Sequence, residues 1–95
     1  MLNIEELTNY LLEQTEYDLK LIYDFGLEEA SRDEEYVSFV KGRIRGYCSA
    51  VFALLLKLRS AQDDVKISDA IHQLIQIRNR AEKKIEEYLL TKPVE

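Results

Sequence analysis

The single histidine of the chain, His72, is the first residue whose type and spacing could do chemistry. Asp69 precedes it by three positions, so the two side chains share one face of a helix. Such a pair binds iron in di-iron bundles, which need a second pair and further inward-facing carboxylates. One pair supplies two ligands, whereas a metal site takes three or four. The sequence therefore predicts no metal site, and an exposed or half-buried histidine with a local hydrogen bond.

The single cysteine, Cys48, is a weaker candidate for chemistry. A cysteine nucleophile needs a base and an electropositive setting. Arg43 and Arg45 lie near it in the sequence, but a helical cysteine in an apolar stretch is typical of a small buried hydrophobe. The phosphate-binding, dinucleotide-binding and nucleophile-elbow motifs are absent, as is the Arg-x(4–6)-His motif of certain all-helical ribonucleases. We therefore expect no catalytic residue, no cofactor and no enzymatic activity.

Basic residues form a candidate anion-binding site. If the last two helices pack antiparallel about a turn near residue 63, position 43 lies opposite about position 83. The bases brought to this level are Lys41, Arg43, Arg45, Arg80, Lys83 and Lys84, with Arg78 one turn away. The candidate anion-binding residues among them are Arg43, Arg45, Arg80, Lys83 and Lys84. They predict a footprint for nucleic acid or a phosphorylated small molecule. The alternative is a solvated face that the acidic residues of the first helix neutralise, with Glu13 and Glu16 at the same level.

Small residues recur within the stretch GRIRGYCSAVFALLLKL, residues 42–58. Gly42, Gly46, Ala50 and Ala53 follow at steps of four, four and three, so they share one side of a helix, opposite Ile44. Each glycine inside a helix costs about 1 kcal/mol relative to alanine, which favours a role in close helix approach. Three interpretations remain open: contact with another helix of the same chain, contact with a second copy or partner, and a ligand cleft.

These residues, with Phe39 or Phe52 as an aromatic anchor nearby, make up the candidate interface. Its members are Phe39, Gly42, Gly46, Ala50, Phe52 and Ala53.

Three helices must position these candidates. Helical periodicity predicts them over residues about 4–24, 32–61 and 65–90, with no strand pattern. Asn3 is the expected N-cap of the first helix, and Gly26 is its expected C-terminal glycine. Ser31 and Glu34 form a capping box, and Pro93 follows the third helix. Either Asp64 or Ser68 is expected to cap that helix.

Apolar residues predict which helix faces meet. On the second helix a heptad seam runs through Val37, Val40, Ile44, Tyr47, Val51, Leu54, Leu58 and Ala61. On the third helix the stripe is Ala70, Leu74, Ile77, Ala81, Ile85 and Tyr88. Short turns then give an all-α, three-helix antiparallel bundle. Because the first helix is the shortest, part of a long hairpin formed by the other two is expected to lack cover, which favours self-association.

Size and charge limit the remaining possibilities. The 95 residues fit one domain, residues 1–95, and the net charge of −5 divides into −9 over residues 1–36 and +4 over residues 37–95. The two parts are expected to pack on each other; alternatively, the acidic helix imitates a phosphate backbone, as in small inhibitors carried by mobile elements. One cysteine, no signal peptide and no membrane-spanning run predict a cytoplasmic protein.

Taken together, the sequence predicts a non-catalytic protein-interaction module that acts as a homo-oligomer, in the manner of a subunit, adaptor or small inhibitor. Its expected partners are itself and another protein. The alternative is the anion-binding function of the basic residues. No motif in the chain identifies a partner by itself.

Overall fold

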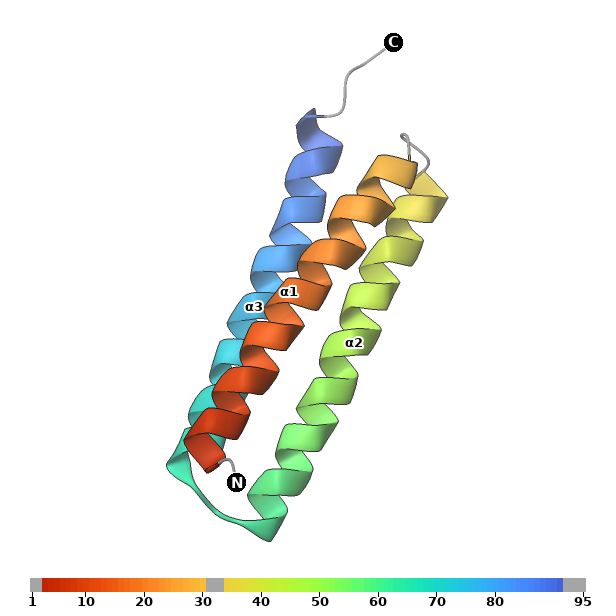
Figure 1. Cartoon of the computed structure of the whole chain (residues 1–95). Coiled ribbons are helices and arrows are strands. Elements are labelled where there is room, and N and C mark those ends of the chain that lie inside the picture. Colours follow the sequence, from red (N-terminus) through yellow and green to blue (C-terminus); the bar gives the residue numbers. More distant parts are fainter. Residues whose placement is uncertain (1–2, 31–33, 92–95) are drawn as a thin grey trace.

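The computed structural model describes residues 3–30 and 34–91, with the side chains of residues 3–26 and 35–88. These residues form three helices, α1 (Ile4–Ala30), α2 (Glu34–Ala61) and α3 (Val65–Thr91). Each helix runs antiparallel to the one before it, and every pair of helices packs together (Figure 1). The predicted all-α, three-helix antiparallel bundle is confirmed. Within the described residues, none of the helices is apolar over a length that could cross a bilayer.

The start of α1 is capped by Asn3, as predicted. The backbone N–H of Glu6 donates to Asn3 Oδ1 at 2.8 Å, while Asn3 Nδ2 donates to Glu6 Oε1 at 3.0 Å. This reciprocal pair satisfies a backbone donor that the helix leaves free at its first turn. It also places a carboxylate at the positive end of the helix dipole.

The predicted end of α1 near Asp24 is wrong. The helix continues through Gly26 to Ala30, which gives it 27 residues, against 28 in α2 and 27 in α3. The expected uncovered part of the α2–α3 hairpin is therefore also wrong, because α1 is as long as its neighbours. The physical reason lies at Gly26, which is a packing residue inside the helix and not its terminator.

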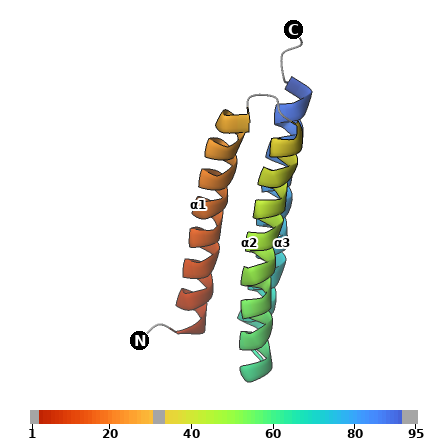
Figure 2. The same cartoon turned by 90° about the vertical axis from the view of Figure 1, so that its right-hand side faces the viewer.

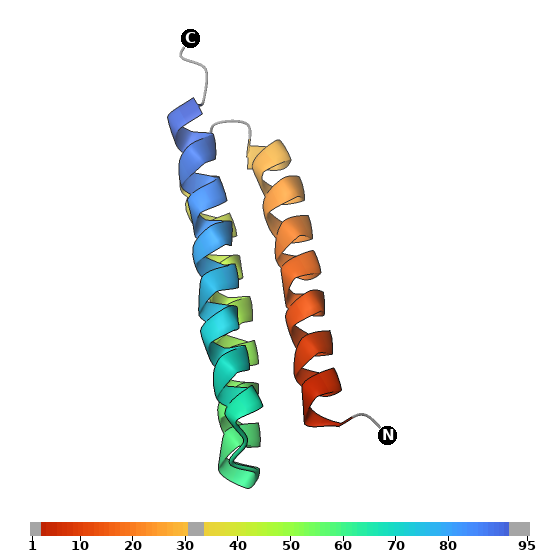
Figure 3. The same cartoon turned by 90° about the vertical axis from the view of Figure 1, so that its left-hand side faces the viewer.

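Gly26 lets α1 approach α2 closely. The residue is buried, and a Cβ atom built on it would lie 2.6 Å from Val40 Cγ2. Any side chain larger than hydrogen would therefore push the two helices apart. The ribbon of α1 comes nearer to the hairpin at this end than at its own N-terminus (Figures 2 and 3).

The core runs along the axis between the three helices. Ile44, Leu55, Ile67 and Ile85 have no exposed surface, and Leu19 of α1 is 1% exposed. The complete core is Leu12, Leu19, Val37, Val40, Ile44, Cys48, Leu55, Ile67, Ala70, Ile71, Leu74, Ile77, Ala81 and Ile85. The predicted stripe of α3 is confirmed, with Tyr88 half-buried at its end.

The predicted heptad seam of α2 is wrong at two positions of its second half, Leu54 and Ala61, whereas Val51 and Leu58 pack against the core as predicted. Leu54 is 44% exposed and Ala61 is exposed, whereas Leu55 is fully buried. A repeat of 3.5 residues per turn selects Leu54, but a straight helix turns every 3.6 residues and drifts by about 20° per heptad. Along α2 this drift moves the buried line onto Cys48 and then Leu55.

The start of α3 is capped by Asp64. Its Oδ1 accepts from the backbone N–H of Lys66 at 2.9 Å, and its carbonyl oxygen accepts from the N–H of Ile67 at 3.0 Å. This decides between the two predicted caps in favour of Asp64. The capping box of Ser31 with Glu34, and Pro93, lie outside the residues whose side chains the structure describes.

Candidate interaction surface

The four small residues of α2 lie on the outside of the bundle. Gly42, Gly46, Ala50 and Ala53, hereafter the small-residue stripe, are all exposed. A Cβ atom built on Gly42 or Gly46 would meet nothing within 4 Å. The interpretation that this stripe packs against another helix of the same chain is therefore wrong. Its contact with a second copy or a partner stays a prediction.

Large apolar side chains are exposed on α1 and α2. In the part of the chain whose side chains are described, seven of the eight exposed large hydrophobic residues belong to these two helices, and the eighth is Val65 at the start of α3. We call the seven the aromatic face: Tyr10, Tyr17, Leu21 and Phe25 of α1, with Tyr36, Phe39 and Leu54 of α2. Five of these seven residues are aromatic, which distinguishes this surface from the polar outer side of α3.

Antiparallel packing puts the two halves of the aromatic face on one side of the molecule. Gly26 and Val40 face each other, and Phe25 and Phe39 are the residues before them. In antiparallel helices the residues preceding a facing pair both point to the same side, because each lies about 100° back along its own helix. The residue that follows the facing position points to the opposite side, toward α3. Lys41, which follows Val40, accordingly forms an ion pair with Glu86 of α3.

The rest of the aromatic face follows from helical spacing. Tyr10, Tyr17 and Leu21 lie at steps of seven and four, so they form one line along α1. On α2, Tyr36 and Leu54 lie eleven residues before and seven residues after Tyr47, which contacts α1. Tyr36 and Leu54 therefore border the groove between α1 and α2.

Two aromatic rings and a guanidinium form a column at one end of the aromatic face. The ring centroids of Tyr36 and Phe39 are 5.8 Å apart, and the Arg43 guanidinium lies 5.9 Å from the Phe39 centroid. Phe39 is 57% exposed, and Phe25 nearby is 64% exposed. Tyrosine and arginine are enriched among residues that dominate binding energy at protein interfaces, and the cation–π contact pre-orders the column.

The two predicted aromatic anchors lie on different sides of the molecule. Phe39 is in line with the small-residue stripe, since Gly46 follows it by seven residues. Phe52 is half-buried and lines a cavity of about 210 Å³ between α2 and α3, together with Cys48 and Arg78. The structure therefore joins Phe39 to the stripe and separates Phe52 from it.

The predicted anion-binding residues are divided among different grooves. Arg45 Nε donates to Glu82 Oε1 at 2.6 Å, across the outer side of the α2–α3 groove. Arg43 instead lies against the ring of Phe39 on the side of α1. These two arginines therefore point away from each other, although two positions separate them in the sequence.

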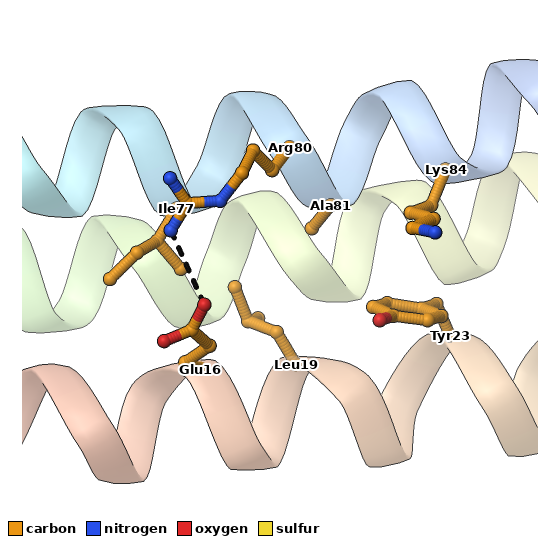
Figure 4. Close-up of a pocket in the computed structure, with 7 residues that line it drawn as sticks. All are labelled: Glu16, Leu19, Tyr23, Ile77, Arg80, Ala81 and Lys84. Carbon is orange, nitrogen blue, oxygen red and sulfur yellow. Dashed lines mark hydrogen bonds and ion pairs between the residues drawn. The ribbon is translucent and has the colours of Figure 1, made fainter.

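A third groove, between α1 and α3, holds two of the remaining bases. Arg80 Nη2 donates to Glu16 Oε1 at 3.3 Å, and Lys84 lies one turn further along α3 near Tyr23 (Figure 4). The groove has a volume of about 160 Å³. Lys83 is exposed and does not line this groove. The structure thus brings Arg80 and Lys84 together, and anion binding by the five bases as one set stays a prediction.

A hydrogen bond between α1 and α2 was missed at the sequence level. The Tyr47 hydroxyl donates to Asp18 Oδ2 at 2.5 Å. Burial, followed by this hydrogen bond and the charge of Asp18, raises the pKa of Tyr47 to about 12. Pairing α1 with α2 about a turn near residue 32 would have placed positions 18 and 47 opposite each other.

The two residues first considered for chemistry have ordinary surroundings. Cys48 is 4% exposed in the core, and burial raises the pKa of its thiol, which lowers the fraction of nucleophilic thiolate. The prediction of a buried, hydrophobic cysteine is confirmed. His72 is exposed. Among the described residues, no three histidine, cysteine, aspartate or glutamate side chains are close enough to hold a metal ion.

Comparison with known proteins adds no family to this geometry. No protein-family model, no curated protein sequence and no solved structure matches the chain significantly.

Proposed function

We propose that this protein is a non-catalytic interaction module that acts as a homo-oligomer, as a subunit, adaptor or small inhibitor would. One observation carries the proposal: α1 and α2 expose seven large hydrophobic residues, which helical spacing places on the side of the bundle away from α3 as the aromatic face. Monomeric proteins rarely expose large contiguous apolar patches, and patches of this kind commonly mark protein–protein contacts.

The composition of the aromatic face supports an interface with another protein. Interface centres are enriched in tyrosine, phenylalanine and arginine, which combine a large apolar area with few rotatable bonds. Tyr36, Phe39 and Arg43 provide this combination in one column. Burying apolar area stabilises a complex by about 25 cal/mol per Å², so this column is where a partner gains most.

The small-residue stripe supports the same function. Gly42 and Gly46 each cost the helix about 1 kcal/mol relative to alanine, and neither makes a close contact within its own chain. The stripe is also in line with Phe39 on α2. A partner helix could approach the backbone closely there and use Phe39 as an anchor.

Light scattering after gel filtration tests the proposal over a range of protein concentrations. We expect a mass of at least two chains for the native sequence. Phe39→Ser combined with Tyr17→Ser should shift the mass toward one chain, because both side chains belong to the aromatic face. Val65→Ser is the matched control, since Val65 is 72% exposed but lies outside that face.

Two results would contradict the proposal. A native chain that stays monomeric up to millimolar concentration would exclude self-association. An oligomer that survives Phe39→Ser with Tyr17→Ser would place the contact elsewhere. Gly46→Leu then tests the stripe alone: a lower mass assigns the stripe to the contact, and an unchanged mass removes it.

A further inference from the structure

The two helices that carry the aromatic face have opposite charge. Residues 4–30, the span of α1, contain eight acidic residues and one basic residue, which gives −7. Residues 34–61, the span of α2, contain two acidic and five basic residues, which gives +3. Part of each charge is directed toward α3, through the ion pairs of Glu5 and Glu16 of α1 and of Lys41 and Arg45 of α2. The aromatic face therefore lies on an acidic helix and a basic helix, and the two are complementary in sign.

The same division in sign is found beside the two exposed phenylalanine rings. Asp24 directly precedes Phe25 on α1, and Arg43 lies over Phe39 on α2. Both charged residues are exposed. Among the residues whose side chains the structure describes, neither Asp24 nor Arg43 has an ion-pair partner. Their charges are thus available to another molecule that covers the rings.

Two identical molecules can meet through this face in two symmetric ways. Both place one aromatic face on the other and differ in the two-fold axis that relates the copies. An axis that crosses the helices puts α1 of one copy on α1 of the other, so that two acidic helices meet. An axis that runs along the helices puts α1 of one copy on α2 of the other, so that an acidic helix meets a basic helix twice. Electrostatic complementarity selects the second arrangement.

Resting on the proposed self-association, we infer that a second copy of this chain binds the aromatic face about a two-fold axis that runs along the helices, with its α1 over α2 of the first copy. Residues then keep their height along the bundle. Because Gly26 faces Val40 within one chain, Phe25 of the second copy falls over Phe39 of the first. Asp24 of the second copy falls near Arg43 of the first.

The arrangement also agrees with helix packing and with the area available. The α1 helix of the second copy runs antiparallel to the α2 helix that it covers. The α1 and α2 helices of the two copies then form a four-helix arrangement in which all neighbours are antiparallel. Two helices about 40 Å long and about 10 Å wide offer roughly 800 Å² per copy. Stable interfaces of standard size bury about this area on each partner.

A charge exchange between Asp24 and Arg43 tests this pairing. Arg43→Glu and Asp24→Lys each turn an attraction into a repulsion, and symmetry repeats it, so each variant should self-associate about tenfold more weakly. A mixture of the two variants should recover native affinity in the mixed dimer, because the glutamate introduced at position 43 of one chain then meets the lysine introduced at position 24 of the other. The readout is sedimentation velocity at low ionic strength, with circular dichroism to show that both variants stay folded.

Glu16→Lys is the matched control for overall charge. It makes the same change on α1 as Asp24→Lys, but Glu16 points toward α3, where its exposed ion pair with Arg80 is worth little. We expect this variant to associate within about twofold of the native protein. If it weakens association as much as Asp24→Lys does, only the net charge of α1 matters and the inferred contact is wrong.

Disulfide crosslinking provides a second measurement that does not depend on charge. A Phe25→Cys chain mixed with a Phe39→Cys chain should form a disulfide-linked heterodimer under mild oxidation. Phe25→Cys mixed with Leu54→Cys should not, because Leu54 lies about 22 Å further along α2. The native Cys48 is buried and serves as the background. Preferential linkage of positions 25 and 54 would overturn the inferred axis.

The outcomes separate the inference from the function on which it rests. Native dimers with no response to the charge exchange and no crosslink between positions 25 and 39 would overturn the inference and leave self-association standing. A native chain that stays monomeric at all concentrations would overturn both.

Discussion

Gly26 and Gly46 are both glycines inside helices, but their surroundings are opposite. Gly26 is buried against Val40, where a Cβ atom would be 2.6 Å from a methyl carbon. Gly46 is exposed, with nothing within 4 Å of the same position. The first glycine explains how α1 and α2 fit together in one chain. The second has no such explanation within the chain, which is why we propose that its side of α2 makes contacts between chains.

The same difference separates two adjacent leucines of α2. Leu55 is completely buried in the core, and Leu54 is 44% exposed on the aromatic face. The inward side of α2 is therefore filled by its own chain, and the outward side carries apolar residues without intramolecular cover. The comparison teaches that burial, and not residue type, tells which positions stabilise the fold and which are available to a partner.

Truncating the two leucines should give the largest contrast. Leu55→Ala leaves a cavity in the core and should reduce the free energy of unfolding by about 2–5 kcal/mol. Leu54→Ala should cost less than about 1 kcal/mol, because its side chain is already partly in water. Urea unfolding followed by circular dichroism, at a concentration where the chain is monomeric, measures both. Equal losses would contradict the assigned sides of α2.

Adding one methyl group at Gly26 should give the next largest effect. Gly26→Ala gains about 1 kcal/mol in helix propensity, but overpacking against the stiff, β-branched Val40 costs about 1–3 kcal/mol. We expect a net loss of stability. In a Val40→Ala background the clash is removed, so the same substitution should become stabilising. A stabilising effect in the native background would show that the helices separate without cost.

The features that the sequence predicted correctly are those that depend on residues close together in one helix. Asn3 caps α1 through a side chain three residues away, and the α3 stripe follows from a regular helical repeat. These contacts depend only on spacing along one helix. The antiparallel bundle follows in turn from three such helices joined by short turns.

The predictions that were wrong are those in which a residue of another helix, or the accumulated rotation of a long helix, determines which side chain is buried. A glycine near the end of an apolar stretch is typical of a C-terminal cap, and only Val40 of another helix shows that Gly26 is a packing residue. Likewise the choice between Leu54 and Leu55 depends on how far α2 turns over five turns. The aromatic face was not predicted, because its two halves come from helices whose relative rotation the spacing does not fix.

Replacing the exposed glycines should have the opposite sign to replacing Gly26. Gly42→Ala and Gly46→Ala should each stabilise the monomer by about 1 kcal/mol, since the methyl group meets nothing and restricts the unfolded chain. Thermal or urea unfolding of the monomer measures this gain. Weaker self-association in the same variants would place the stripe at the interface. A loss of monomer stability would contradict the open surroundings of both glycines.

Tyr47 lies at the boundary between the inward and outward sides of α2 and should give the smallest effect. Burial, together with its hydrogen bond to Asp18, raises the pKa of Tyr47 from the ordinary 10.0 to about 12. Between these values the folded chain keeps the phenolic proton while the unfolded chain loses it. The stabilisation is therefore complete below pH 10 and is lost as the pH rises toward 12. Tyr47→Phe should remove this pH dependence and cost about 1 kcal/mol at neutral pH, because it removes one hydrogen bond between partly buried groups. Urea unfolding of the two proteins from about pH 8 to about pH 12 gives the difference. A native curve that stays parallel to that of Tyr47→Phe throughout this range would show that the hydrogen bond between α1 and α2 does not distinguish the two protonation states.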